Sequence, residues 1–350
     1  MTTISSTTAV SVQRQTISSR IALTVALLII LVIPTMPWWA SGGHIRWLVE
    51  LSCMIAIAQM WNLLAGYAGL VSVGQQAFIG AGGYALFVLA TKLGVNPFLA
   101  VPLSVVAPVA LAIPSYFLLR RLDGSYFAIG TWVLAELFRL LTANIPYLNS
   151  GAGMSLSVMA RYSQDQRQIA LASFCAVLLF ITVGGVYWLL RSRHGLALTA
   201  MRDDPVAAES QGVNVKRLRF VVFVLAAAGS GLAGAVYYMA QLRINPESGF
   251  DSNWSSICIF AVMVGGIGRI EGAIVGVLLY FFATRLFGQY GASYLVVLGL
   301  LTVFVALFAP GGLWSLLLKV RNWPWFPVSR RLIGEPPQRE GGLRMAGETR

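Results

Sequence analysis

The amino-acid sequence predicts an all-α, polytopic integral membrane protein. Of its 350 residues, 57% are hydrophobic and only 11% are charged, and the mean hydropathy is +0.74. Soluble domains carry about 25% charged residues, so this chain has too few to cover its surface in water. Long apolar runs recur along most of the chain, and most approach the roughly 20 residues that a helix needs to cross a bilayer.

About ten transmembrane helices are expected, some of them broken or re-entrant. The first run, 21–39, is longer than the core of a signal peptide and ends in two tryptophans, which favours a retained span. The segment 253–268 is short and is therefore a candidate for a broken or re-entrant helix. In chain order the predicted spans are 21–39, 47–67, 74–91, 97–119, 126–147, 168–190, 220–240, 253–268, 271–288 and 293–314.

The basic residues between the spans favour an orientation with both termini in the cytoplasm, because cytoplasmic loops are enriched in Lys and Arg. In that orientation the largest inner loop, 191–219, holds six basic residues, and the tail after 318 holds seven. The outer segments hold five: Arg46, Lys92, Arg161, Arg167 and Arg243. We therefore expect disordered cytoplasmic tails at 1–20 and 319–350, flanking one transmembrane domain at 21–318.

Several classes of protein are excluded by what the sequence lacks. The net charge of +12 comes from loops and the C-terminal tail, so it indicates membrane orientation and not a nucleic-acid partner. GxxxxGK[ST], HExxH and GxSxG motifs are absent. Cys53, Cys175 and Cys258 lie singly in apolar runs, and His44 and His194 are far apart. We expect no catalytic residue, cofactor or metal site, so any energy comes from an ion gradient or from another protein.

Three amides interrupt the apolar pattern between Trp61 and Tyr84. Asn62, Gln75 and Gln76 fall at probable membrane depth among many glycines. Irregular backbone at that depth persists only where protein or a water-filled cavity satisfies it. The amides are therefore candidates for a substrate pathway, or else they bond across closely packed helices.

A charged pair lies near the middle of the predicted span 126–147. Glu136 and Arg139 are three residues apart and so share one helix face. A charge at the centre of a bilayer costs on the order of 3 kcal/mol, so this face is buried or wet. The pair belongs to the substrate pathway, or else it is a structural ion pair that ties two helices together.

A turn with the sequence Gly268-Arg269-Ile270 is expected on the cytoplasmic side. Glu271 follows it, and a surface charge is the default expectation there. A second contact with a docked partner is the alternative.

The loop 191–219 carries the signals of a short capped helix. Asp204 is a good N-cap, Pro205 suits the first turn, residues 206–211 can be helical, and Gly212 can end the helix. A rigid, charged segment of this kind between spans predicts a docking surface for a soluble partner. An ordinary connector is the alternative.

Four segments together resemble the LivM-type permeases of the branched-chain amino acid ABC importers. They are NLLAGYAGLVSVGQQAFIGAGGYA, LDGSYFAIGTWVLAELFRLL, MRDDPVAAESQGVN with the following AAAGSGLAGAVY, and VMVGGIGRIEGAIVG. Ala207-Ala208-Glu209 and Gly212 are similar to the "EAA…G" motif that couples importer permeases to their ATPases. The coupling residues implied by the resemblance are Arg202, Asp203, Asp204, Pro205, Ala207, Ala208, Glu209, Gly212 and Asn214.

The resemblance also implies a set of partners and a location. It implies a heterodimer with a second, LivH-like permease, two ABC ATPase subunits and an extracytoplasmic solute-binding protein, in the lipid of a bacterial inner (plasma) membrane. The predicted function is transport of branched-chain or related amino acids. Alternatives are an ABC permease for urea or short amides, an ion-coupled secondary transporter with Glu136 as the ion relay, and a membrane-embedded enzyme, for which clustered acids or histidines are lacking.

Overall fold

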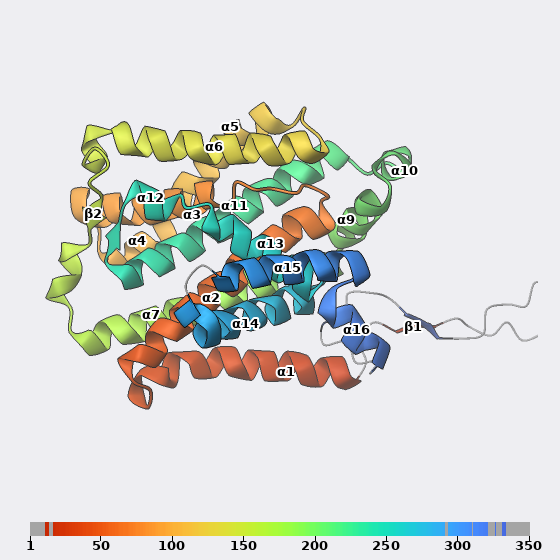
Figure 1. Ribbon diagram of the computed structural model, residues 1–350, viewed down its shortest axis with the longest axis horizontal. Helices are drawn as coiled ribbons and strands as arrows, with labels where there is room; N and C mark the ends of the chain where they lie inside the picture. Colours follow the sequence, from red (N-terminus) through yellow and green to blue (C-terminus); the bar gives the residue numbers. More distant parts are fainter. Residues whose placement is uncertain are drawn as a thin grey trace, which may run out of the picture.

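The computed structural model describes residues 11–13, 17–290, 293–309, 311–320, 326 and 331–333. Almost all of them are helical, and the long helices run roughly side by side in one bundle (Figure 1). The described strands form two short antiparallel pairs: β1 (Ser11–Gln13) with β4 (Arg331–Ile333), and β2 (Met154–Ser155) with β3 (Arg243–Ile244). The prediction of an all-α membrane protein is confirmed, whereas most residues of the two predicted disordered tails lie outside the described residues.

The described residues of the first half of the chain contain six α-helices, several of which are extended by 3-10 or π turns. In order these elements are α1 (Ile17–Val32), η1 (Ile33–Trp38), α2 (Gly42–Asn62), η2 (Leu63–Tyr67), α3 (Gln76–Phe87), η3 (Val88–Lys92), α4 (Pro97–Leu103), α5 (Val106–Leu119), α6 (Gly124–Asn144), η4 (Pro146–Leu148) and η5 (Ser157–Arg161).

The second half contains ten more α-helices in the described part of the chain. They and their turns are α7 (Gln164–Leu179), η6 (Phe180–Gly184), α8 (Gly185–Arg191), α9 (Arg193–Asp203), α10 (Pro205–Ser210), α11 (Val215–Gln241), α12 (Pro246–Gly249), α13 (Asn253–Gly265), α14 (Ile270–Phe287), η7 (Gly288–Tyr290), α15 (Ser293–Phe308) and α16 (Gly312–Val320).

The expected count of about ten spans is wrong. Within the described residues six helical stretches are long and apolar enough to cross a membrane, or seven if α15 and α16, which meet at 51°, form one broken span. Three predicted spans are too short: 21–39 contains the shorter apolar helix Leu23–Trp38, 74–91 corresponds to α3 with η3, of 17 residues together, and 253–268 contains α13, of 13 residues. Helices of 13 to 17 residues extend about 20–26 Å, against a hydrocarbon core of about 30 Å. The start of α3 is buried and bonded to Ser230 of α11 and Ser255 of α13, whereas α13 begins at exposed Asn253.

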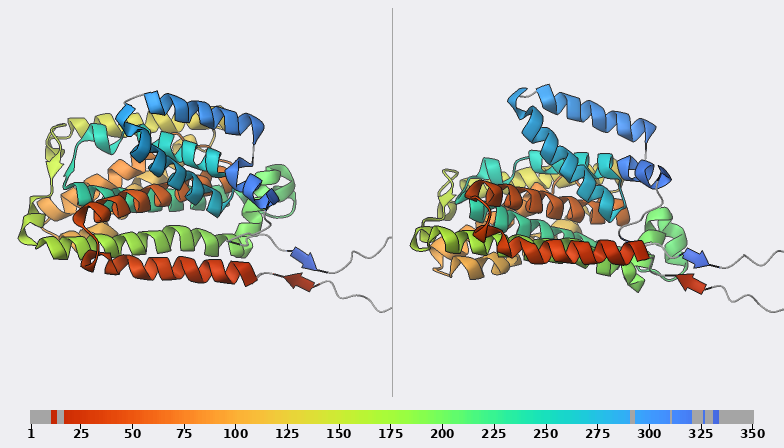
Figure 2. Two further views of the ribbon diagram at one scale, coloured as in Figure 1. Left: turned by 60° about the horizontal axis from the view of Figure 1, so that its bottom comes forward. Right: turned by 90° about the horizontal axis from the view of Figure 1, so that it is seen from below.

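α2 lies at the centre of the bundle, and its apolar part is 83% buried. α5 and α6 lie along one edge and α1 along the opposite edge (Figure 1), whereas α15 is set apart from the rest of the bundle (Figure 2). The three cysteines are buried, with 0–2% of their surface exposed, as the sequence predicts. α9 and α10 protrude at one end of the bundle, and β2 and α12 lie at the other (Figure 1).

Glycines allow α3 and α11 to approach backbone to backbone. A Cβ atom added at Gly82 would lie 2.0 Å from the carbonyl oxygen of Gly231, and one at Gly234 would lie 2.2 Å from that of Ile79. No side chain fits at those distances. The glycine-rich sequence between 66 and 84 therefore serves close helix packing at this contact.

Candidate functional site

The protruding α9–α10 segment is built by local capping. The Asp204 carboxylate accepts hydrogen bonds from the backbone N–H groups of Val206 (2.9 Å) and Ala207 (3.0 Å), so it caps α10. Pro205 occupies the first turn, and Gly212 has a φ of +86°, a left-handed conformation that favours glycine. Asn214 in turn caps α11 by accepting from the N–H of Arg217 at 2.9 Å. The predicted capped helix is confirmed, whereas the preceding α9 carried no cap signal that the sequence analysis used.

One side of this segment is anchored and the other is free. Ala208 is 3% exposed and packs in a cluster with Met201 and Val215, which are also buried. The other eight residues of the predicted coupling set, Arg202, Asp203, Asp204, Pro205, Ala207, Glu209, Gly212 and Asn214, are exposed. Val206, which the sequence analysis did not single out, is a large apolar side chain with 77% of its surface exposed at the tip. The segment thus presents a rigid surface with an apolar centre and a charged surround.

A polar clamp connects α2 with the turn before α14, next to Arg202. Asn62 accepts from the N–H of Gly268 at 2.8 Å and donates to the carbonyl of Arg269 at 2.9 Å. Gln59, one helical turn earlier, donates to the carbonyl of Ile270 at 2.6 Å. A Cβ atom at Gly268 would lie 3.0 Å from a guanidinium nitrogen of Arg202, so the turn lies directly against the end of α9. Asn62 is fully buried in this clamp.

Gln75 and Gln76 bond the start of α3 to α11 and to the first turn of α13. Gln75 donates to the Ser230 hydroxyl at 2.7 Å and to the Ala226 carbonyl at 3.3 Å. The Ser255 hydroxyl donates to the side-chain oxygen of Gln76 and accepts from the backbone N–H of Gln75. Both glutamines are at most 1% exposed. In this arrangement the amides bond across helices, and Ser230 and Ser255, missed by the sequence analysis, are their partners.

Glu136 and Arg139 form an ion pair on the exposed face of α6 and do not join the amides. The opposite face of α6 contacts the segment before α3, where the Thr131 hydroxyl accepts from the N–H of Val73 at 3.0 Å. The five predicted pathway residues therefore fall into separate places: the Asn62 clamp, the glutamine contacts and the outer face of α6.

A polar cavity of about 660 Å³ opens at the end of the bundle away from α10, between α2, α11, α13 and α14. Glu50, Arg243 and Asp251 bring both signs of charge to it, and Tyr238 and Trp254 supply aromatic surface. Glu50 is also ion-paired with Arg285. The size and mixed charge of the cavity suit a small zwitterion. The sequence analysis missed this cavity because its lining residues are spread over about 230 positions of the sequence.

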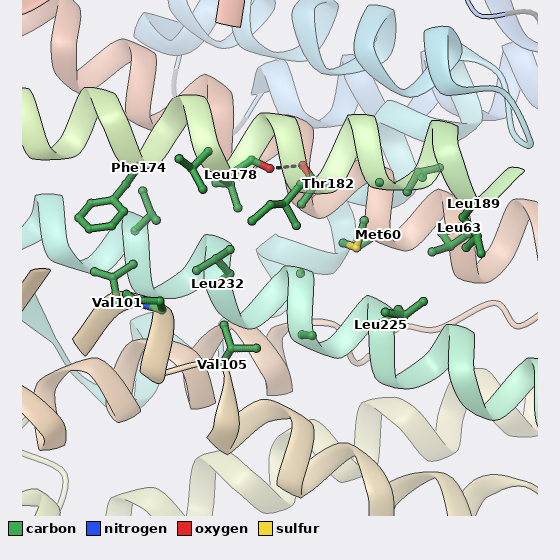
Figure 3. Close-up of a pocket in the computed structure, with 18 of the residues that line it drawn as sticks. Met60, Leu63, Val101, Val105, Phe174, Leu178, Thr182, Leu189, Leu225 and Leu232 are labelled. Carbon is green, nitrogen blue, oxygen red and sulfur yellow. Dashed lines mark hydrogen bonds between the residues drawn. The ribbon is translucent and has the colours of Figure 1, made fainter. Parts of the chain in front are cut away.

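A second cavity, of about 540 Å³, is almost entirely apolar (Figure 3). Its side chains come from α7 and α8 on one side and from α11 and the α4–α5 region on the other. Thr182 donates its hydroxyl to the Leu178 carbonyl at 2.7 Å, which leaves that polar group satisfied. Such a lining suits hydrocarbon and offers little to a charged solute.

Glu271 is 5% exposed and accepts a hydrogen bond from the backbone N–H of Phe326 at 2.6 Å. The expectation of a surface charge at this turn is therefore wrong. The Phe326 ring also packs edge-on against Tyr187 at the end of α8. A residue of the C-terminal segment thus covers the carboxylate, which is a long-range contact that the local sequence does not reveal.

Comparison with known proteins places these features in a family. Residues 44–306 match the family described as the permease component of branched-chain amino acid transport systems. The LivM permease protein of the high-affinity branched-chain amino acid transport system of Escherichia coli K12 is 26% identical, over 85% of this chain and 76% of that protein. BraD of Pseudomonas aeruginosa is 27% identical, over 73% and 90%, and the probable LivH permease of Methanocaldococcus jannaschii is 26% identical, over 63% and 72%. The resemblance to LivM-type permeases is confirmed, and this multi-pass membrane protein belongs to the family of branched-chain amino acid transport permease components.

Proposed function

We propose that this chain is the membrane-spanning permease subunit of an ATP-binding-cassette importer for branched-chain or related amino acids in the bacterial inner membrane. Its partners would be a LivH-like permease, two ATPase subunits and an extracytoplasmic solute-binding protein. Both termini would then be cytoplasmic, with the α9–α10 segment on the cytoplasmic side and the polar cavity on the outer side.

The observation that carries the proposal is the combination of an exposed α10 surface with a buried anchor. Val206 and Glu209 are exposed, whereas Ala208 is packed among core residues. A force applied by an ATPase at α10 would thus be borne by packed helices and by the contact of Arg202 with the turn at Gly268. That turn is bonded to α2 through Asn62, which offers a continuous path into the bundle.

The proposed solute path runs from the outer cavity past α13 and α6. Gln75 and Gln76 are sealed between helices here, so their proposed part in the path requires a second arrangement of α3 and α13. Asn62 would act at the inner end of the path, and Glu136 and Arg139 would border the path from the outer face of α6. Alternating between two packings of this kind is typical of transporters with discontinuous helices.

Uptake of radiolabelled leucine by cells that carry the complete transporter tests the proposal. Val206→Asp, Glu209→Ala and Gly212→Val should reduce uptake to background and lower the amount of co-purified ATPase, with membrane levels of the chain unchanged. Asp165→Ala, which removes an exposed acid at the other end of the bundle, is the matched control. Normal uptake in the three α10 variants would contradict the coupling role, and uptake that survives ATP depletion under a maintained gradient would favour an ion-coupled transporter.

A further inference from the structure

An ion pair lies on a face of α6 that no part of this chain covers within the described residues. The Nε of Arg139 donates to both carboxylate oxygens of Glu136, at 3.0 and 2.9 Å. The Glu136 side chain is 47% exposed and that of Arg139 is 29% exposed. The pair lies in a stripe of exposed apolar residues that follows the helical repeat: Ile129, Trp132, Val133, Leu137, Leu140 and Leu141.

In a membrane-spanning α6 the pair falls within the hydrocarbon core. α6 has 21 residues and is one of the helices long and apolar enough to cross a membrane. With a rise of 1.5 Å per residue, Glu136 lies about 3 Å beyond the middle of the helix and Arg139 about 8 Å beyond it. A hydrocarbon core about 30 Å thick therefore surrounds both positions unless protein or water replaces it.

The pair does not tie α6 to another helix of this chain. In the part of the chain that the structure describes, the Arg139 guanidinium has no hydrogen-bond acceptor besides Glu136, although the Glu247 carboxylate of α12 attracts it from a greater distance. Arg139 also donates one Nη2 N–H to Glu136, so three of its five guanidinium N–H groups are left to be satisfied from outside. Lipid tails cannot accept hydrogen bonds, and uncompensated polar groups at this depth cost several kcal/mol each.

We propose that the exposed face of α6, centred on Glu136 and Arg139, is the interface with a second permease subunit of the same family. This inference rests on the proposed function, since it locates one of the partners named there. ATPases and a solute-binding protein act outside the bilayer and cannot reach the middle of α6, so only a membrane-embedded partner can supply the acceptors. The partner's contacting helix presents hydroxyl, amide or carbonyl oxygens to Arg139, between apolar residues that pack on Trp132 and Leu137.

Photo-crosslinking in native membranes tests where the partner lies. p-Benzoylphenylalanine is placed in the full complex at Val133 or Leu137 on α6, which are 57% and 45% exposed, and at Val177 on α7, which is 51% exposed, as the matched control. The α6 positions should give an adduct with a second family permease, identified by mass spectrometry, and Val177 should not. Three outcomes would overturn the inference. The α6 positions could give adducts with lipid alone, or they could give adducts with a second copy of this chain. The third outcome is an adduct with the second permease from Val177 and from neither α6 position.

Charge substitutions supply an independent readout. E136Q or R139Q alone leaves one uncompensated charge at the interface and should lower co-purified second permease at least tenfold, whereas the double substitution E136Q/R139Q should restore much of it. Equal co-purification from the two single variants and the wild type would contradict the inference. If wild-type protein brings down no second permease, the proposed function falls as well. If wild-type protein does bring down a second permease but crosslinks to it only through α7, the proposed function stands and only the placement of the interface on α6 is wrong.

Discussion

The Asn62 side chain and the backbone N–H of Gly268 are joined by a 2.8 Å hydrogen bond across 206 residues of sequence. The same amide donates to the Arg269 carbonyl, so one side chain of the central helix fixes both sides of the turn that precedes α14. The turn also lies in direct contact with η2, because a Cβ added at Gly66 would lie 2.6 Å from the Gly268 nitrogen. The end of α9, α2 and α14 are therefore mechanically connected at one point.

Replacing Asn62 with Leu should weaken this connection. The substitution keeps the branched shape of the side chain but removes one acceptor and one donor, and the orphaned backbone groups cost about 1–3 kcal/mol. We expect a lower unfolding temperature in detergent and a loss of leucine uptake. Asn144→Leu, at an exposed site on α6, is the control for the change of residue type. An unchanged unfolding temperature for Asn62→Leu would show that the clamp adds no stability.

Gly82→Ala should disrupt the contact of α3 with α11. The new methyl group would overlap the carbonyl oxygen of Gly231, so the helices must separate, at a cost of about 1–3 kcal/mol or more. We expect a fall in the folded fraction measured by gel filtration in detergent. Gly299→Ala on α15 has nothing within 4 Å of the added methyl group and should fold as well as the wild type.

Asp204→Ala should loosen α10 without unfolding the protein. Loss of an N-cap costs about 0.5–2 kcal/mol, and here it frees the N–H groups of Val206 and Ala207. Hydrogen exchange at those amides should accelerate, while exchange in α11 stays as slow as in the wild type. Asp203→Ala removes only a surface ion pair with Arg202 and should leave α10 exchange unchanged. Equal exchange in the two variants would argue against the capping role.

Gln75 and Ser230 should be energetically coupled. Their side chains share a buried 2.7 Å hydrogen bond between α3 and α11. Chemical denaturation of Gln75→Leu, Ser230→Ala and the double variant should give an interaction free energy of about 0.5–3 kcal/mol, since residues in one buried network are not additive. Additive effects would show that the bond contributes nothing beyond packing.

The sequence was sufficient to predict the fold class, the helix-rich regions and the α10 cap, because apolar length and cap chemistry are local properties. It overestimated the number of spans since α3 and α13 are apolar enough to look like spans. The bonds that hold the start of α3 to Ser230 and Ser255 join residues distant in sequence, so local apolarity does not reveal them. The packing role of Gly82 is likewise visible only once Gly231 is known to face it.

The candidate site was predictable in part for the same reason. The exposed α10 residues follow one another in the chain, and a motif can reveal them. The polar cavity brings together Glu50, Arg243 and Asp251 from separate elements, and no spacing rule connects them. The buried environment of Glu271 depends on Phe326, 55 residues further on, so its local sequence suggested the wrong exposure.

Because all three cysteines are buried, the natural chain can serve as the unlabelled background for experiments that label newly introduced cysteines. Cys53, Cys175 and Cys258 are each at most 2% exposed, so a bulky membrane-impermeant maleimide finds no accessible thiol. One new cysteine at exposed Ser163, before α7, and another at exposed Ser210, at the end of α10, would each report its own side of the membrane in intact cells. The orientation of every loop can be mapped this way, without first removing residues that pack the core.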